Sequence, residues 1–253
     1  MQMKTKLYIV VIVALLAASA AQAQFKLGVR AGVSMTNLSE DDVVNNLWKP
    51  GFQVGIVGNY ALSDAFSIQP GLLFVTQGRK MDYTGETEGA VYSVTENISL
   101  NYLQLPVDAQ YKFYLGKLKL LLQAVPYLGY GLGGKRKLDN TLNGVLTSTD
   151  EKIKMGSDKF ELGMNLKSFD FGLGGGIGLK FSNIQIGLKY NLGLMNLNSM
   201  TEKKHRDFYI SQGGTLAQYE ELVRLNPKDI EWILKHKIKN HGLILSFTFL
   251  FGK

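Results

Sequence analysis

Apolar and polar residues alternate along the chain in segments of about ten residues or more. In FKLGVRAGVSMT, every second residue from Phe25 to Met35 is apolar, and the residues between them are polar or glycine. Strict period two predicts a β-strand whose two faces meet different surroundings. The pattern recurs, and it predicts eight strands, over residues 25–36, 51–62, 66–74, 101–115, 117–132, 168–181, 184–194 and 242–251.

The connections between these segments alternate between short and long. The tight turns cover residues 63–65, 116–117 and 182–183, and the long connections cover residues 36–50, 78–97, 133–167 and 196–240. A transmembrane barrel has short periplasmic turns, long extracellular loops and an even number of strands, each of roughly ten residues. We therefore predict an all-β fold, an eight-stranded antiparallel transmembrane β-barrel with long extracellular loops.

Alternation does not say which face meets water, so a soluble barrel with an apolar interior, as in lipocalins, is the alternative. Glycine crowds the second face, most densely at Gly172, Gly174, Gly176 and Gly178. A narrow lumen needs small residues, whereas glycine on a solvent face would only weaken a strand. Aromatic residues recur near segment ends on the apolar face, as interfacial girdles require: Phe25, Tyr60, Phe66, Tyr111, Phe113, Tyr130, Phe169, Phe181 and Phe251.

The N-terminal residues 1–23 have the pattern of a secretory signal. Lys4 and Lys6 precede an apolar run, and the small-residue site Ala21-Gln22-Ala23 predicts cleavage before Gln24. This leaves residues 24–253 as the barrel domain. With no cysteine, the sequence has neither a disulfide framework nor the acylated cysteine of a lipoprotein. The net charge is +7, and two of the positive charges, Lys4 and Lys6, lie in the signal. The sequence has no block of like charges that would indicate nucleic-acid binding.

Four segments resemble landmarks of the PorT-like outer-membrane β-barrel proteins, a porin family in the broad sense: FKLGVRAGVSMTNLS, NYLQLPVDAQYKF, DFGLGGGIGLKF and GLILSFTFLF. The resemblance covers nearly all of the mature chain. It implies an eight-stranded barrel in the outer membrane of a Gram-negative cell, in contact with outer-membrane lipid. Since PorT assists export of proteins to the cell surface, it also implies a role in secretion or envelope assembly. The chain departs from the usual aromatic ending, because Gly252 and Lys253 follow Phe251.

Charged residues fall on the predicted lumen face: Arg30, Asp108, Lys112, Asp170, Lys180 and Lys189. Side chains fill an eight-stranded interior, and charges buried there must pair to offset desolvation. We expect a salt-bridge network that blocks the lumen, with Asp108 and Asp170 shared among the bases. A gated or proton-conducting interior, acting as a narrow pore for small solutes, is the alternative.

No nucleotide, cofactor, metal or catalytic site is expected. YLGYGLGGK matches the glycine spacing GxGxxG, but no helical pattern follows it to hold a phosphate. His205, His236 and His241 do not have metal-ligand spacing. Some eight-stranded barrels modify lipid A with a His and a Ser near the outer rim, yet His241 and Ser246, five residues apart, point to opposite faces of their strand. A lipid A-modifying enzyme is therefore kept as the least favoured alternative.

The fourth long connection predicts two short helices. The segment TLAQYEELVRLNPKDIEWILKHKIK is interrupted at Asn226-Pro227, where Asn226 is a cap and Pro227 is a first helical residue. Ile230, Ile233, Leu234 and Ile238 form an apolar stripe, and Trp232 points away from it. Two roles are open for this segment. Either its stripe packs on the barrel rim or on other loops, or the segment docks an envelope protein or a surface ligand with Trp232 as its anchor.

Overall fold

Eight strands in the described part of the chain close into a barrel. The structure, a computed structural model, describes residues 25–40, 46–87, 90–157 and 165–252, so the expected signal at residues 1–23 lies outside it. The strands are β1 (Phe25–Glu40), β3 (Lys49–Ala61), β4 (Phe66–Thr87), β5 (Ala90–Leu115), β6 (Leu118–Leu142), β8 (Phe169–Phe181), β9 (Ile184–Gly193) and β10 (Ile238–Leu250). Each is antiparallel to its neighbours, and β1 pairs with β10 to close the ring. The predicted eight-stranded barrel is confirmed.

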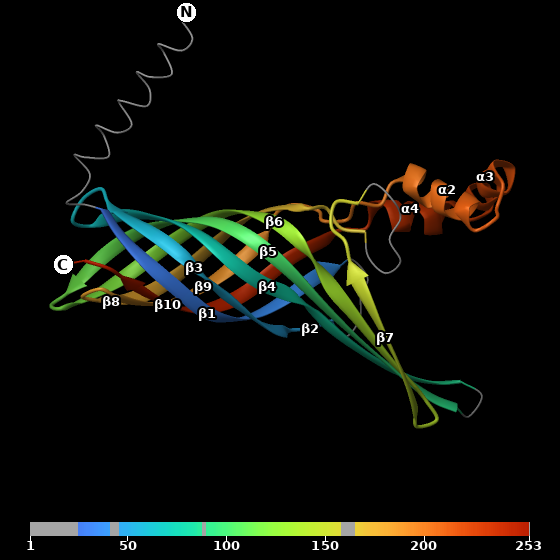
Figure 1. Cartoon of the computed structure of the whole chain (residues 1–253), viewed down its shortest axis with the longest axis horizontal. Coiled ribbons are helices and arrows are strands. Elements are labelled where there is room, and N and C mark those ends of the chain that lie inside the picture. Colours follow the sequence, from blue (N-terminus) through green and yellow to red (C-terminus); the bar gives the residue numbers. More distant parts are fainter. Residues whose placement is uncertain (1–24, 41–45, 88–89, 158–164, 253) are drawn as a thin grey trace, which may run out of the picture.

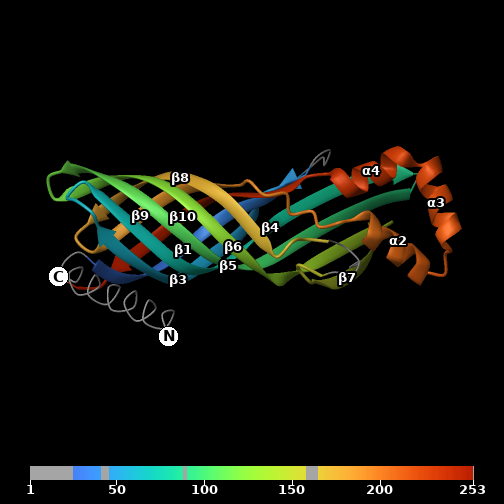
Figure 2. The same ribbon diagram turned by 90° about the horizontal axis from the view of Figure 1, so that it is seen from above.

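The two ends of the barrel differ. The C-terminus, the start of β1 and the short turns lie at one end, while the helices and two long hairpins extend from the other (Figures 1 and 2). Because outer-membrane barrels keep their termini and short turns on the periplasmic side, the end that carries the helices faces the outside of the cell.

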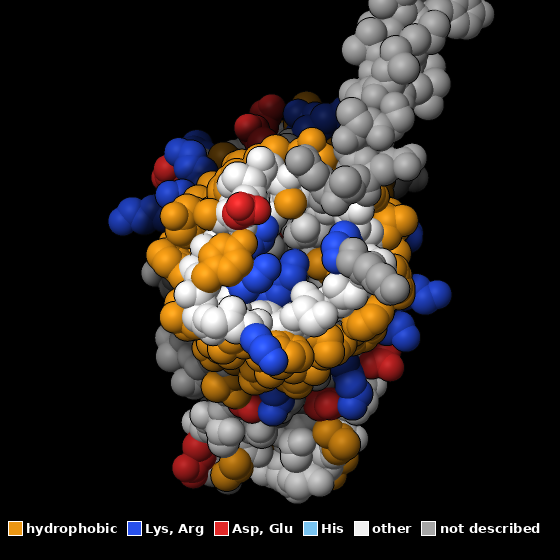
Figure 3. Space-filling view, turned by 90° about the vertical axis from the view of Figure 1, so that its left-hand side faces the viewer, with side chains coloured by type: hydrophobic (Ala, Val, Ile, Leu, Met, Phe, Trp, Pro, Cys, Tyr) orange, Lys and Arg blue, Asp and Glu red, His pale blue; other side chains and the backbone are white. Residues whose placement is uncertain are grey.

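The barrel wall has a polar inner face and an apolar outer face. Along β10, Ser246 and Thr248 are buried in the lumen, whereas Leu245, Phe247 and Phe249 are exposed on the outside. Hydrophobic side chains surround the barrel when it is viewed from the periplasmic end (Figure 3). This arrangement is the reverse of a lipocalin-type barrel and fits a wall surrounded by lipid.

Two of the predicted loops are strands. Residues 78–87 and 90–97 continue β4 and β5 as a pair of antiparallel strands beyond the barrel, and residues 133–142 continue β6 into a hairpin with β7 (Val145–Ile153). A short strand β2 (Asn46–Leu47) pairs with β4 on the opposite edge. The predicted long connections over residues 78–97 and 133–167 are therefore present, but much of each is a β-hairpin that extends beyond the barrel. Beyond the buried Arg79 and Glu96, residues on both faces of this sheet are exposed or half-buried, so the sequence there lacks the one-sided alternation that marks the barrel strands.

Three helices follow β9: α2 (Glu202–Ser211), α3 (Leu216–Leu225) and α4 (Pro227–Lys235). The two predicted helices are confirmed, with Thr215 and Gln218 forming a capping box at the start of α3 and Pro227 at the first position of α4. Asn226 precedes α4 but makes no side-chain capping hydrogen bond. Helix α2 was not predicted. None of these described helices is long and apolar enough to cross a membrane.

An apolar cluster fills the extracellular end of the lumen. We call it the apolar cap; it consists of Leu38, Ile98, Leu100, Tyr102, Ile153, Leu166, Leu197 and Ile238. Its members come from β1, β5, β7 and β10, from the segment that precedes β8 and from the segment that follows β9. All of them are at most 4% exposed. Burying this apolar area ties the extracellular segments to the barrel.

Candidate functional site

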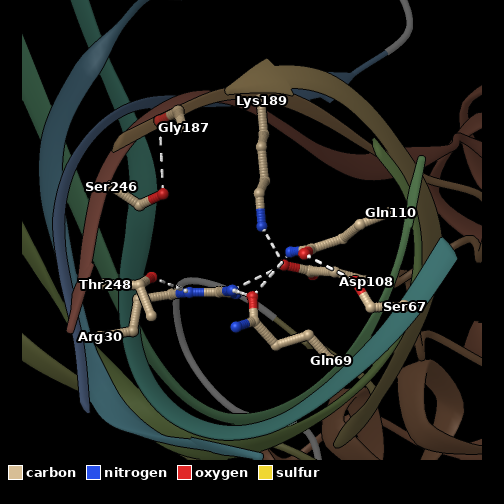
Figure 4. Close-up of polar contacts among 9 residues, drawn as sticks. All are labelled: Arg30, Ser67, Gln69, Asp108, Gln110, Gly187, Lys189, Ser246 and Thr248. Atoms are coloured by element: carbon tan, nitrogen blue, oxygen red, sulfur yellow. Dashed lines mark hydrogen bonds and ion pairs between the residues drawn. The ribbon is translucent and has the colours of Figure 1, made fainter. Parts of the chain in front are cut away.

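A charge cluster crosses the middle of the lumen. Arg30 on β1 donates from Nη2 to Oδ2 of Asp108 on β5, at 2.6 Å, and from Nε to Oγ1 of Thr248, at 3.0 Å. Lys189 on β9 forms an ion pair with the same carboxylate. The three side chains reach inward from separate parts of the ring and meet near its centre (Figure 4). We call Arg30, Asp108 and Lys189 the lumen charge cluster.

Amide side chains extend the hydrogen bonding around this cluster. Gln69 accepts at Oε1 from Arg30, at 2.6 Å, and from Gln110 Nε2, at 2.8 Å. Each charged member is less than 5% exposed. Buried charges are tolerated only when they are paired and hydrogen-bonded. The cluster therefore links β1, β5 and β9 across the lumen, and both of its ion pairs depend on the carboxylate of Asp108.

Only part of the predicted lumen network forms. The pairing of Arg30, Asp108 and Lys189 is confirmed. The expectation that Asp170 shares the bases is wrong, because Asp170 accepts a hydrogen bond from Asn240, at 2.8 Å, and no base pairs with it among the described residues. Lys112 and Lys180 are also separate from the cluster. They line the periplasmic mouth, since they lie close to the short turns at the ends of their strands.

Between the lumen charge cluster and the apolar cap, the described lumen is nearly filled. The cavity lined by Ser34, Gln53, Gln104 and Asn191 has a volume of about 10 Å³. A space of that size holds about one water molecule. Charged, amide and apolar layers therefore follow one another from the mid-lumen to the outer end.

Outside the membrane, the outer parts of β4, β5 and β6 together with β7 form a sheet, which we group with α2, α3 and α4 as the extracellular head. Glu96 is buried in the sheet, where it accepts from Arg79 Nη2, at 3.0 Å, and from Arg136 Nε, at 2.6 Å. Burial opposes the charge of Arg136, but hydrogen bonds to Glu96 and Glu151 outweigh it and raise the pKa of the guanidinium. This network joins neighbouring strands.

In the helical part of the head, Tyr219 and Ile230 are the buried apolar side chains among the described residues. Ile230 is 7% exposed, and Ile233 and Leu234 are half-buried, so Ile230 is unavailable for the partner docking that the sequence suggested. Trp232 is 45% exposed, and its ring stacks on His236 with 4.7 Å between centroids. In the same region the ring of His205 packs against Tyr219, and burial lowers the pKa of the His205 imidazole.

The histidine and the serine considered for catalysis, His241 and Ser246, lie on opposite faces of β10. Ser246 is buried in the lumen and donates to the carbonyl of Gly187, at 3.3 Å, whereas His241 lies beside the rings of Trp48 and Tyr190 on the outer face of β10. The prediction that they point to opposite faces is confirmed. Among the described residues, no group of three or more His, Asp or Glu side chains is placed to hold a metal.

A closed antiparallel barrel with an apolar wall, a polar interior and elaborated loops at one end defines the class of outer-membrane β-barrel proteins. Residues 20–199 match the model of the outer membrane protein beta-barrel domain, and the chain belongs to this family. The match ends before α2, α3, α4 and β10, so the helical part of the head lies outside it.

Solved barrels from other bacteria are similar to this chain. The attachment invasion locus protein Ail of Yersinia pestis is 12% identical with a TM-score of 0.36, over 90% of this chain and 99% of that chain. Neisserial surface protein A is 12% identical with a TM-score of 0.38, over 89% of this chain and 97% of that chain. No match was found among curated proteins.

Proposed function

We propose that this outer-membrane barrel is a non-enzymatic protein that presents its extracellular head to a partner or ligand and conducts no solute. The observation that carries the proposal is the filled lumen, in which the lumen charge cluster and the apolar cap occupy successive layers. A barrel of eight strands has an interior just wide enough for side chains, so a filled lumen leaves the head as the part available for binding.

A head built outside a rigid barrel is suited to recognition. Glu96 and its two arginines connect the strands of the outer sheet, and Trp232 offers a large exposed ring on α4. Tryptophan is enriched among the residues that dominate binding energy at protein interfaces. The PorT-like resemblance favours a partner in secretion or envelope assembly, and export by a signal over residues 1–23 belongs to the same proposal.

We expect the purified wild-type protein to be silent in planar lipid bilayers, because ions have no continuous aqueous path past the filled lumen. Single-channel recording checks this, with a known porin as the control for insertion and with heat-modifiable electrophoretic mobility as the control for folding. Reproducible conductance steps from the folded barrel would favour the narrow-pore alternative.

Copurification tests the binding role. A variant in which residues 201–235 are replaced by a short Gly-Ser linker lacks the helices but keeps Ile238, which belongs to the apolar cap. We expect detergent-solubilised wild type to retain a partner that this variant loses, and Trp232→Ala to weaken retention by about tenfold or more. Lys203→Ala, at an exposed position on α2, is the matched control and should retain the partner.

A partner that binds wild type, the linker variant and Trp232→Ala equally would exclude the helices as the site. A lipid A-modifying activity is the remaining alternative, and the separation of His241 from Ser246 opposes it. A lipid A mass profile that changes on overexpression of the protein would reverse that conclusion.

A further inference from the structure

The periplasmic mouth of the barrel is a basic cavity. It has a volume of about 390 Å³ and is lined by Lys26, Lys112, Lys119 and Lys180, which come from four different strands, β1, β5, β6 and β8. Lys and Arg side chains gather inside the hollow at this end, and hydrophobic side chains of the outer wall surround them (Figure 3). The four ammonium groups therefore face the cavity rather than the lipid.

Two of these lysines contact neutral groups. Lys26 Nζ donates to Oδ1 of Asn183, at 3.3 Å, and Lys119 Nζ lies 4.8 Å from the centre of the Tyr114 ring. In the part of the chain that the structure describes, none of the four forms a salt bridge, although the carboxylate of Asp64 also lines the cavity. The lining thus has an excess of three positive charges.

The contrast with the layer above indicates what the mouth is suited to bind. In the lumen charge cluster, Arg30 and Lys189 both pair directly with one carboxylate, that of Asp108, which leaves a net charge of +1, whereas the mouth gathers four cations against the single carboxylate of Asp64. A cleft lined by one sign of charge, with low-dielectric walls, focuses the potential and concentrates ions of the opposite sign. Within the described part of the chain, the lumen charge cluster lies behind this cavity, which opens toward the periplasm.

We propose that this mouth is a binding site for a multivalent oxyanion of the phosphate class. Lysine binds phosphate as a compact point charge, and several lysines around one cavity match the charge of a group that carries two or more negative charges. A soluble phosphate compound in the periplasm and the phosphate of an anionic lipid headgroup at the rim are the two sources of this chemistry. The site lies at the opposite end from the extracellular head, so neither proposal depends on the other.

Inorganic pyrophosphate is the probe for the test. Full-length barrel in a non-ionic, phosphate-free detergent is titrated calorimetrically at low salt, and we expect saturable binding that weakens as salt rises. Lys112→Gln with Lys180→Gln should weaken it by at least about tenfold, because each substitution removes a charge-assisted contact. Lys203→Gln with Lys228→Gln, at exposed positions on α2 and α4, removes the same charge and should leave binding unchanged.

Each outcome decides the question. No binding of pyrophosphate by the folded wild type, or equal weakening in both double variants, would overturn the proposal, since the second result reflects net charge alone. If Lys112→Gln with Lys180→Gln does not fold, Lys26→Gln, at a half-buried position of the same cavity, is used instead. Folding is checked by heat-modifiable mobility.

Native mass spectrometry then distinguishes the sources. If the wild type retains phosphatidylglycerol in preference to phosphatidylcholine, and Lys112→Gln with Lys180→Gln abolishes that preference, the ligand is a lipid headgroup. If the wild type binds pyrophosphate but retains neither lipid, the ligand is a soluble phosphate compound. An acidic glutamate peptide that binds in the same lysine-dependent way while pyrophosphate does not would overturn the assignment to phosphate.

Discussion

Asp108→Asn should destabilise the barrel by about 3–5 kcal/mol, the cost of removing one partner from a buried ion pair. Asp108 is fully buried and is the carboxylate to which both Arg30 and Lys189 bind. Asparagine keeps the size of the side chain but leaves both cations in the lumen without a counter-charge. Urea unfolding in lipid vesicles, followed by loss of the folded electrophoretic band, measures the change.

Asp170→Asn is the matched control. Asp170 is also buried in the lumen, but it accepts from Asn240 and pairs with no base among the described residues. Its replacement breaks no ion pair and alters hydrogen bonds with neutral partners, so it should cost about 0.5–1.5 kcal/mol. If both variants lose the same stability, the lumen charge cluster does not hold the barrel together in the way proposed.

The barrel could be predicted from the sequence because lipid and lumen impose opposite demands on successive residues. Along residues 168–181 the alternation of Phe171 and Leu173 with Gly172 and Gly174 follows directly from those two environments. The alternation of short and long connections then gives the orientation. Both signals are local in the sequence, so a single chain is enough to detect them.

The extracellular head was only partly predictable. Beyond Arg79 and Glu96, residues on both faces of its sheet are exposed or half-buried, which removes the pattern that identifies a strand, and β7 is exposed along nearly all its length. Helix α2 has no buried residue and therefore no apolar stripe to detect. The signals for α3 and α4 were stronger, because Asn226-Pro227 divides them and Ile230 belongs to a buried stripe.

The membership of the lumen charge cluster could not be predicted because it depends on the height of each residue along the barrel. Alternation places Lys112 and Lys189 on the same face, but the stagger of the strands sets one at the mouth and the other at mid-lumen. The sequence did contain a usable signal for the mouth. Lys112, Lys119 and Lys180 all lie within four residues of a predicted periplasmic turn, so their proximity to one rim could have been inferred.

Gly176→Val should prevent folding or cost more than about 3 kcal/mol, beyond ordinary overpacking. A Cβ at this lumen-facing position would collide with the carbonyl oxygen of Leu188 and lie 2.9 Å from Cα of Lys189. Both atoms belong to the backbone of β9, which cannot retreat without breaking its pairing with β8. The added side chain would also meet Cγ of Lys189 and displace its ammonium group from Asp108.

The adjacent residue provides the control. The nearest atom to a Cβ at Gly175 is the carbonyl oxygen of Gln123, at 4.0 Å, and this position is on the exposed outer face. Gly175→Val should therefore fold, and it should gain strand propensity and contact with lipid. Refolding into vesicles and insertion into the outer membrane, both measured by the heat-modifiable band, compare the two variants. If both fold equally well, the lumen glycines are not required for space, and the filled lumen that supports the closed-barrel proposal must be less tightly packed than the structure indicates.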